Sequence, residues 1–233
     1  MKHACLIDLG KRDYKEAWKL QLDLVARRAC DEIPDVLFFV EHPHVYTVGR
    51  KSHDQRRALR VGGESILCYA IERGGDVTYH GPGQLVGYPI FKLSEQERDL
   101  HGYLRDIERV LIHTCADFGI SVDRRRGLTG VWTNEKISRK IASIGVAVKH
   151  WVTYHGFALN VSTNLNFFHP INPCGLDASV MTSMEHYLKQ PVSLAHVKAK
   201  LVAHASSVFH ITFEAAPDMS HLPKEAANVT KFV

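Results

Sequence analysis

Hydrophobic and polar residues recur along the chain with two different periods, which predict helices and strands in a definite order. Apolar residues at helical spacing predict a first amphipathic helix over about 13–30, and Asp13 with Glu16 forms a capping box at its start. The same spacing predicts a second helix over about 99–118 and a last one over about 193–209. Short runs rich in β-branched and aromatic residues, bounded by Gly, Pro or Asp, predict strands. These predicted strands cover residues 36–40, 45–48, 66–71, 85–90, 141–148 and 152–161.

Strands gather in the middle of this pattern, and helices lie toward its ends. This order lacks the regular strand-helix alternation of a doubly wound sheet, and it favours the α+β class. No repeat, low-complexity tract or linker divides the 233 residues, and a chain of this length closes one sizeable hydrophobic core. We therefore expect a single α+β domain over residues 1–233.

Composition and charge narrow the classes of function. With 45% hydrophobic and 23% charged residues, the chain lies in the ordinary globular range. No stretch approaches the roughly 20 apolar residues of a membrane helix, and Asp8 interrupts the N-terminus before the apolar core of a signal peptide. We expect a cytoplasmic protein that binds no membrane. The net charge of +4 favours acidic partners but not nucleic acid, and the basic run 124–126 either contacts an acidic protein or is a solvated loop.

Cysteine and histidine spacing indicates neither a disulfide framework nor a metal site. The five cysteines are odd in number, scattered and free of Cys-x-x-Cys spacing, so we expect each to be a reduced thiol. The fifteen histidines include His42 with His44 and His150 with His155, but these spacings match no common zinc pattern. No metal cofactor is expected.

The densest chemical signal is the glycine-rich segment 73–84. Its four glycines allow the backbone to approach a ligand closely or to adopt left-handed conformations, while Arg73, Tyr79, His80 and Gln84 supply polar groups. The spacing matches neither a P-loop nor a dinucleotide-binding fingerprint. We interpret the segment as a binding loop, with a structural crossover as the alternative.

Cys174 is the cysteine whose local sequence favours reactivity. It stands between Pro173 and Gly175, which predict a turn, and the residues after it, up to about Glu185, predict the start of a short helix. A thiol before a helix N-terminus or beside a cation has a lowered pKa, and the thiolate is the nucleophile. The alternative role is that of a small buried hydrophobic residue.

Two further segments hold isolated polar residues within apolar strands. Lys140 opens the run 141–148, and it is either a catalytic group or a surface residue whose stem lies along apolar neighbours. His155 and Gly156 lie inside the apolar run 152–161. Read alone, neither segment identifies a function.

Taken together and in this order, the segments resemble the lipoyl(octanoyl) transferase family, the octanoyl-acyl-carrier-protein:protein N-octanoyltransferases. The resemblance covers most of the chain, from about residue 36 to about residue 184. Small departures occur where Ser138-Arg139 replaces a common glycine before Lys140 and where His44 replaces a frequent second proline. The matching stretches are Glu41-His42-Pro43, Val45 to Arg50, Arg73 to Gln84, Gly130-Val131-Trp132, Lys140 to Gly145, His155 to Val161 and Pro173-Cys174-Gly175.

The resemblance implies a fold and a set of site residues. The implied fold is that of biotin and lipoate protein ligases, a central mixed β-sheet flanked by helices, with its core over about 31–215. Cys174 is implied to be the acyl acceptor, and Lys140 its partner. Backbone amides near Cys174 and in the Gly74-Gly75 loop are candidate donors to the tetrahedral intermediate. The residues implied to line the acyl pocket are Arg73, Gly74, Gly75, Asp76, Val77, Thr78, Tyr79, His80, Ser143, Ile144, Gly145, Gly156, Phe157 and Ala158.

The implied reaction transfers an octanoyl group from octanoyl-acyl carrier protein, through a Cys174 thioester, to a lysine of a lipoyl-accepting domain. The implied acceptors are lipoyl domains of 2-oxoacid dehydrogenase subunits and the H-type protein of glycine cleavage. A carrier thioester is already activated, so a thiolate accepts the acyl group without ATP. An ammonium such as that of Lys140, if it lowered the thiol pKa by about two pH units, would favour the thiolate by about 2.7 kcal/mol. The same lysine, once neutral, is suited to take a proton from the incoming amine.

Three other functions stay open. An ATP-dependent lipoate or biotin protein ligase on the same fold needs a lysine but no nucleophilic cysteine. A non-catalytic module that binds acyl carrier protein or a lipoyl domain would use the positive charge and the run 124–126. A cysteine hydrolase ranks last, because no hydrolase signature surrounds Cys174.

Overall fold

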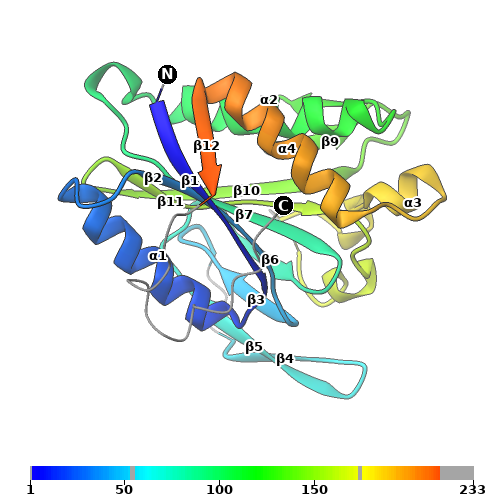
Figure 1. Ribbon diagram of the computed structural model, residues 1–233. Coiled ribbons are helices and arrows are strands. Elements are labelled where there is room, and N and C mark those ends of the chain that lie inside the picture. Colours follow the sequence, from blue (N-terminus) through cyan, green and yellow to red (C-terminus); the bar gives the residue numbers. More distant parts are fainter. Residues whose placement is uncertain (1, 53–55, 173–174, 216–233) are drawn as a thin grey trace.

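The fold is described by a computed structural model, which covers residues 2–52, 56–172 and 175–215. An eight-stranded mixed sheet forms the centre of the molecule (Figure 1). The N-terminal strand of the chain is parallel to both of its neighbours in this sheet, and all other neighbouring strands in the sheet are antiparallel. In spatial order the strands are β12 (Ile211–Ala215), β1 (Lys2–Lys11), β2 (Asp35–Glu41), β7 (Gln84–Ile90), β11 (Val152–Asn160), β10 (Lys140–Lys149), β9 (Leu128–Thr133) and β8 (Val122–Arg125).

Helices cover both faces of this main sheet. The helix α1 (Tyr14–Ala29) lies on one face, and α2 (Leu100–Asp117) with α4 (Leu194–Phe209) lies on the other (Figure 1). The alternation of side chains along β2 shows why: Phe38 packs in the cluster of α1, whereas Phe39 packs in the cluster of α2 and α4. Since both faces are covered, the central strands read as almost unbroken apolar runs.

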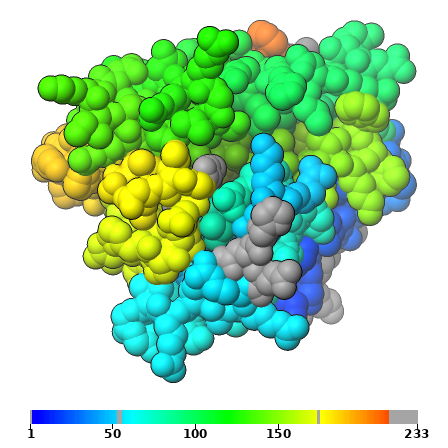
Figure 2. Space-filling view, turned by 180° about the vertical axis from the view of Figure 1, so that it is seen from behind, coloured from blue at the N-terminus to red at the C-terminus, as the bar shows by residue number. Residues whose placement is uncertain are grey.

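A second, four-stranded sheet carries the glycine-rich segment. In order its strands are β4 (Ala58–Val61), β5 (Glu64–Ala70), β3 (Val45–Val48) and β6 (Val77–His80). The short 3-10 helices η2 (Leu165–Phe168) and η4 (Ala178–Val180) pack on this sheet, since Phe168 and Ala178 share a buried cluster with Tyr46. Figure 2 shows the resulting surface, with the yellow η2–η4 region beside the cyan β4–β5 hairpin. The remaining short elements are η1 (Glu95–Glu97) and α3 (Met184–Leu188).

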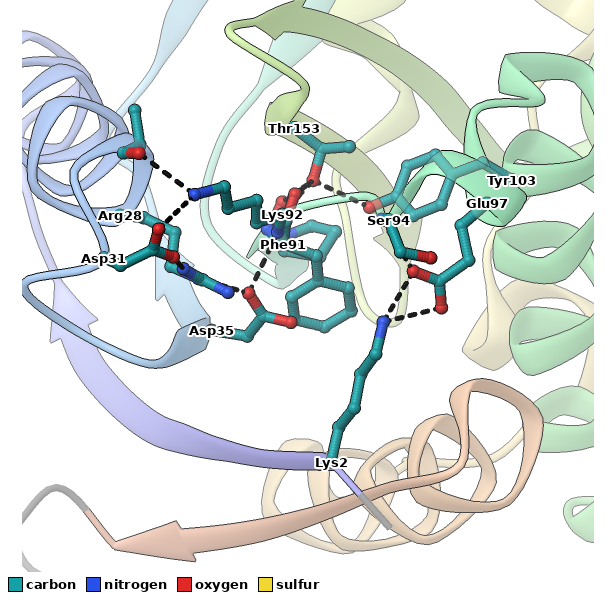
Figure 3. Close-up of polar contacts among 12 residues, drawn as sticks. Lys2, Arg28, Asp31, Asp35, Phe91, Lys92, Ser94, Glu97, Tyr103 and Thr153 are labelled. Carbon is teal, nitrogen blue, oxygen red and sulfur yellow. Dashed lines mark hydrogen bonds and ion pairs between the residues drawn. The ribbon is translucent and has the colours of Figure 1, made fainter.

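Polar contacts tie the helices to one end of the main sheet (Figure 3). Asp35, which is 5% exposed, accepts hydrogen bonds from Nε of Arg28 at 2.6 Å and from the backbone N–H of Lys92 at 2.9 Å. On the other side, the hydroxyl of Tyr103 in α2 donates to Oγ1 of Thr153 at 3.1 Å. These contacts join α1, β2, β11 and α2 where β2 and β11 begin and β7 ends.

The expected fold class and most predicted elements are confirmed. The three predicted helices are α1, α2 and α4, and the six predicted strands are β2, β3, β5, β7, β10 and β11, all within a few residues of the expected bounds. Asp13 caps α1 by accepting hydrogen bonds from the N–H groups of Lys15 and Glu16. The sequence did not indicate β1, β4, β6, β8, β9 or β12. Of these, β6 lies inside the segment that we interpreted as a loop, because Val77 to His80 pair with β3.

Candidate functional site

A cavity lies between the main sheet and the glycine-rich segment of the second sheet. It contains about 540 Å³ of unfilled space, its open mouth included. Its wall comes from α1, β6, β7, β10, β11 and the residues before β6. The residues that line it are Tyr14, Arg73, Gly75, Asp76, Val77, Thr78, His80, Val86, Tyr88, Lys140, Ser143, Ile144, Gly145, His155, Gly156, Phe157 and Ala158.

The glycine-rich segment crosses from the second sheet to β10. The Gly74 N–H donates to the Val146 carbonyl at 2.9 Å, and the Gly75 carbonyl accepts from Lys51 N–H at 3.0 Å. A Cβ on Gly49 would lie 2.5 Å from the Gly75 carbonyl oxygen, so only a glycine permits this close approach. Because its N–H is already bonded to β10, Gly74 is not an available donor for an intermediate, contrary to the expectation from the sequence.

Arg73 anchors this segment from within. Its side chain is 8% exposed and donates to the Thr47 carbonyl at 2.7 Å and to Thr47 Oγ1 at 3.0 Å. It also donates to the Gly74 carbonyl at 3.0 Å. Arg73 therefore brings a buried positive charge to the cavity while holding β3 against the glycine-rich segment.

Small residues keep the sheet side of the cavity open. In the register of β10 and β11, Gly145 lies opposite Gly156 and Ser143 lies opposite Ala158. A Cβ on Gly145 would lie 2.8 Å from the Gly74 carbonyl oxygen. Any larger residue there would push the glycine-rich segment away from the sheet, so the sequence of β10 fixes the height of the cavity.

Aromatic and neutral histidine side chains form another part of the wall. His80 is 7% exposed, its ring stacks on Tyr14 at 6.0 Å, and its Nδ1 lies 2.8 Å from Gln84 Oε1. Burial, followed by repulsion from His42, lowers the pKa of His80 to about 3. Gln84 in turn donates to Asn160 Oδ1 at 2.9 Å, which fixes the orientation of this network. The histidine is therefore neutral at pH 7.

His155 is the most unusual polar side chain of the wall. It is 2% exposed and has a φ of 55°, a conformation that non-glycine residues adopt rarely. Among the described residues neither ring nitrogen has a hydrogen-bond partner, although Glu72 Oε2 lies 3.5 Å from Nε2. Burial, followed by repulsion from Arg73, lowers its pKa to about 3. A bound water or ligand group would satisfy these orphaned nitrogens.

Lys140 lies at one end of the main sheet, and the hydrogen bonds of Asp35 described above lie at the other end. It begins β10, is 3% exposed and lines the cavity. Its carbonyl accepts from the Thr182 N–H at 3.0 Å, and it forms an isolated parallel bridge with Met181. The chain that follows Cys174 thus comes back to the strand of the lysine. The surface alternative for Lys140 does not hold, because its side chain is buried.

The proposed nucleophile Cys174 lies outside the described residues, as does Pro173. On the described side of this gap, the Gly175 N–H donates to the Asn172 carbonyl at 3.0 Å. The other four cysteines do not line the cavity. Burial raises the pKa of the Cys115 thiol to about 12, which opposes ionisation of this thiol.

The structure gathers most of the residues that the resemblance implied. Lys140 and the pocket residues on β10 and β11 all line the cavity, as do Arg73, His80 and the intervening residues except Gly74 and Tyr79. Tyr79 is fully buried in the core of the second sheet, where its hydroxyl lies 2.7 Å from His44 Nδ1. The roles of these residues in binding stay predictions.

Four lining residues were not among the predicted pocket residues. Val86 and Tyr88 alternate on β7 and face the cavity together, so the period of two along a predicted strand could have identified them as a pair. His155 was noted only as part of a motif and as a possible metal ligand. Tyr14 had no signal in the sequence, because its place depends on the packing of α1 against the second sheet.

Within the described ranges, no group of three or more His, Cys, Asp or Glu side chains could hold a metal ion. Within the same ranges, none of the helices is both long and apolar enough to cross a membrane.

Comparison with known proteins gives relatives in sequence and in fold. Residues 13–206 match the family model described as the lipoyl protein ligase A/B catalytic domain. An octanoyltransferase of Syntrophotalea carbinolica is 49% identical over 201 residues, which are 86% of this chain and 92% of that protein. An octanoyltransferase of Solibacter usitatus is 45% identical over 226 residues, which are 94% of this chain and 98% of that protein.

Solved structures of lipoate protein ligases share the fold. A bipartite lipoate protein ligase of Thermoplasma acidophilum has a TM-score of 0.71 at 16% identity and matches 93% of this chain and 87% of that chain. A lipoate-protein ligase A bound with ATP has a TM-score of 0.67 at 15% identity and matches 92% of this chain and 88% of that chain. At these identities the likeness concerns the fold alone.

Proposed function

The chain belongs to the lipoyl protein ligase A/B catalytic-domain family, and we propose that it transfers octanoyl groups through a thioester on Cys174. Relatives between 42% and 49% identical over most of the chain are octanoyltransferases, so this protein is an acyltransferase of the octanoyl group in lipoate biosynthesis. The donor is octanoyl-acyl carrier protein. The acceptors are lysines of lipoyl domains in 2-oxoacid dehydrogenase subunits and of the H-type protein of glycine cleavage.

The observation that carries the cysteine mechanism is the junction between Lys140 and the chain that follows Cys174. Met181 pairs with Lys140, and the Thr182 N–H donates to the Lys140 carbonyl at 3.0 Å. The Asn160 side chain donates to the Thr182 carbonyl at 2.9 Å and reinforces this junction. Because the lysine lines the cavity, the junction supports a site in which sulfur, amine and acyl group meet at one end of the cavity.

The proposed reaction has two acyl transfers. The Cys174 thiolate attacks the carbonyl carbon of the carrier thioester, a tetrahedral intermediate forms, and the carrier thiolate leaves with a proton from Lys140. The acceptor amine then attacks the enzyme thioester, an amide bond forms, and the Cys174 thiolate leaves. Lys140, now neutral, takes the proton that the acceptor nitrogen loses. No step consumes ATP, because each thioester is already activated.

The cavity suits a short acyl chain in this scheme. Val86, Ala158 and Tyr88 give a largely apolar surface on the sheet side. His80 and His155 carry no charge at pH 7, since burial lowers the pKa of each to about 3. An acyl chain therefore meets apolar or neutral groups over most of this wall.

The ATP-dependent ligase is the second candidate because solved ligases share the fold. That function requires activation of a free acid as an acyl-adenylate and makes no use of a cysteine. The sequence relatives favour the transferase over it.

The test is intact-mass spectrometry after the protein is mixed with octanoyl-acyl carrier protein in the absence of ATP. The wild-type protein should gain one octanoyl group that hydroxylamine removes, and Cys174→Ala should gain none. Cys30→Ala is the matched control, since Cys30 is an exposed thiol outside the cavity, and it should acylate as the wild type does. An undiminished adduct on Cys174→Ala, or lysine acylation that requires ATP, would refute the proposal.

A further inference from the structure

The indole ring of Trp132 lies beside the amine of Lys140. The two residues are directly paired across β9 and β10, so their side chains leave the sheet on the same side. Nζ of Lys140 is 5.4 Å from the centre of the indole, and the ring is 1% exposed. An ammonium within about 6 Å of an aromatic ring is stabilised by the negative face of the ring, and burial strengthens this attraction. The indole is not a base that could take a proton from the ammonium, so the ring stabilises the charged form of Lys140 only.

A glycine and a buried carboxylate hold this arrangement in place. Gly130 has a φ of 124°, and a Cβ there would lie 2.6 Å from Cε of Lys140. The N–H of Gly130 donates to Oε1 of Glu108, a residue of α2 whose side chain is fully buried. Oε2 of Glu108 accepts from Arg105 at 2.6 Å and from Nε of Arg124 at 3.0 Å. Arg124 of the basic run 124–126, although its side chain is 36% exposed, therefore helps to neutralise the buried Glu108.

Other charged and titratable groups lie around the lysine or line the same cavity. Arg125 shares the ring of Trp132, with its guanidinium carbon 5.3 Å from the ring centre. Glu108 lies behind Gly130 and is paired with two arginines. The segment that pairs with the Lys140 backbone contributes Met181 and Thr182, which do not titrate. Groups that line the same cavity are Tyr14, Arg73, Asp76, His80, Tyr88 and His155.

We propose that Trp132 is a positioning residue that keeps Lys140 in its ammonium form and thereby keeps the Cys174 thiol ionised. The inference rests on the proposed cysteine mechanism, in which the lysine and the cysteine act as a pair. Burial of Lys140, which is 3% exposed, favours the neutral amine, and a neutral amine does not stabilise a thiolate. A group that offsets this effect of burial and retains the ammonium therefore also favours the thiolate. Gly130 has no side chain and so leaves space for the lysine side chain beside the ring, and the hydrogen bond to Glu108 holds Gly130 in place.

The expected effect follows from the strength of such contacts. Loss of a cation–π contact at a buried ring should raise the apparent pKa of the Cys174 thiol by up to about one and a half pH units, because the thiol responds only to the loss of the Lys140 proton. At pH values below the thiol pKa of both proteins, the rate of reaction of this thiol should therefore fall by up to about thirty-fold. A residue that only filled space would change stability but not this pKa.

The experiment measures the rate at which iodoacetamide alkylates Cys174 in the full-length protein as a function of pH. Trp132→Leu should shift the profile to higher pH, and Trp132→Phe should shift it less in the same direction. Trp151→Leu is the matched control, because it removes an indole that also holds a cation, Arg98 at 4.7 Å, but that lies at the β10–β11 turn. A Trp132→Leu protein that is folded but titrates as the wild type does would overturn the inference, as would an equal shift in Trp151→Leu.

Replacement of tryptophan by 5-fluorotryptophan keeps the measurement decisive if Trp132→Leu does not fold. Fluorine weakens the negative face of the ring at nearly constant size, so the labelled protein should shift in the same direction as Trp132→Phe. The same labelling in a Trp132→Phe background should add no shift. A labelled protein with the wild-type profile would contradict the role of the ring.

A double variant separates this inference from the proposed function. Lys140→Ala should itself shift the thiol profile upward, and Trp132→Phe in that background should add nothing, because its effect passes through the lysine. If Lys140→Ala leaves the profile unchanged, the pairing of lysine and cysteine in the proposed function is wrong. If Lys140→Ala shifts the profile and the Trp132 variants do not, the present inference alone is wrong.

Discussion

Moderate acid should destabilise this protein strongly, because three histidines beside the cavity are buried without charge. His42 is fully buried, and its pKa is lowered to about 4 chiefly by burial. Burial lowers the pKa of His80 and of His155 to about 3. In the unfolded chain each histidine binds a proton with a pKa of about 6.5. Stability from these residues is thus complete above that value and is lost as the pH falls toward 4.

The size of this effect follows from proton linkage. Between pH 7.5 and pH 5 the unfolded chain gains nearly one proton per buried histidine, which lowers the free energy of unfolding by about 2 kcal/mol for each. The three histidines together give about 6 kcal/mol, which equals the whole stability of many domains. The carboxylates with lowered pKa, such as Asp177, add to the loss only at lower pH.

Urea unfolding followed by circular dichroism at several pH values measures this loss. His42→Gln should reduce the slope of stability against pH near pH 5.5 by about one third, since one of three protons is removed. His101→Gln, an exposed histidine of α2, is the control and should leave the slope unchanged. If the wild-type protein loses less than about 1 kcal/mol between pH 7.5 and pH 5, the histidines are not held neutral in the fold.

Three further predictions test the site and its support. Lys140→Ala should slow formation of the octanoyl adduct by about 100-fold or more, the usual effect of losing an acid–base group, and single-turnover mass spectrometry checks this. Gly145→Ala should raise the carrier concentration needed for half-maximal acylation, because the new Cβ would lie 2.8 Å from the Gly74 carbonyl oxygen; an unchanged dependence would mean that the cavity tolerates it. Asp35→Asn should lower the free energy of unfolding by about 2 kcal/mol in urea, since Arg28 loses its buried partner (Figure 3), while acylation at 25 °C stays as in the wild type.

Hydrophobic periodicity and unbroken apolar runs predicted the elements that are buried in the core. The stripes of α1, α2 and α4 and the apolar runs of β2, β7 and β11 are local patterns, and each was found within a few residues. Some of the missed strands are defined by partners that are distant in the sequence. For instance, β1 lies between β2 and β12 and pairs Lys2 with Ile211, which no local pattern indicates.

Motifs in the sequence predicted most of the candidate site, and one exception shows the limit. Thr78 and His80 face the cavity, whereas Tyr79 points into the core of the second sheet. Side chains alternate along a strand, so this difference follows once the segment is known to be β6. Because we interpreted the segment as a loop, we had no reason to expect that Tyr79 points away from the cavity while its neighbours line it.

By itself, the sequence determined the kinds of chemistry that the protein carries, because residue types and glycine positions in the motifs are local properties of the chain. Tertiary structure alone decided which of these groups meet. Sheet order brings β10 beside β9, which places Trp132 next to Lys140, and α1 packs so that Tyr14 stacks on His80. Tyr14 and His80 are far apart along the chain, and Trp132 and Lys140 meet only through the register of their strands, so both contacts form only when the sheet and its helices assemble.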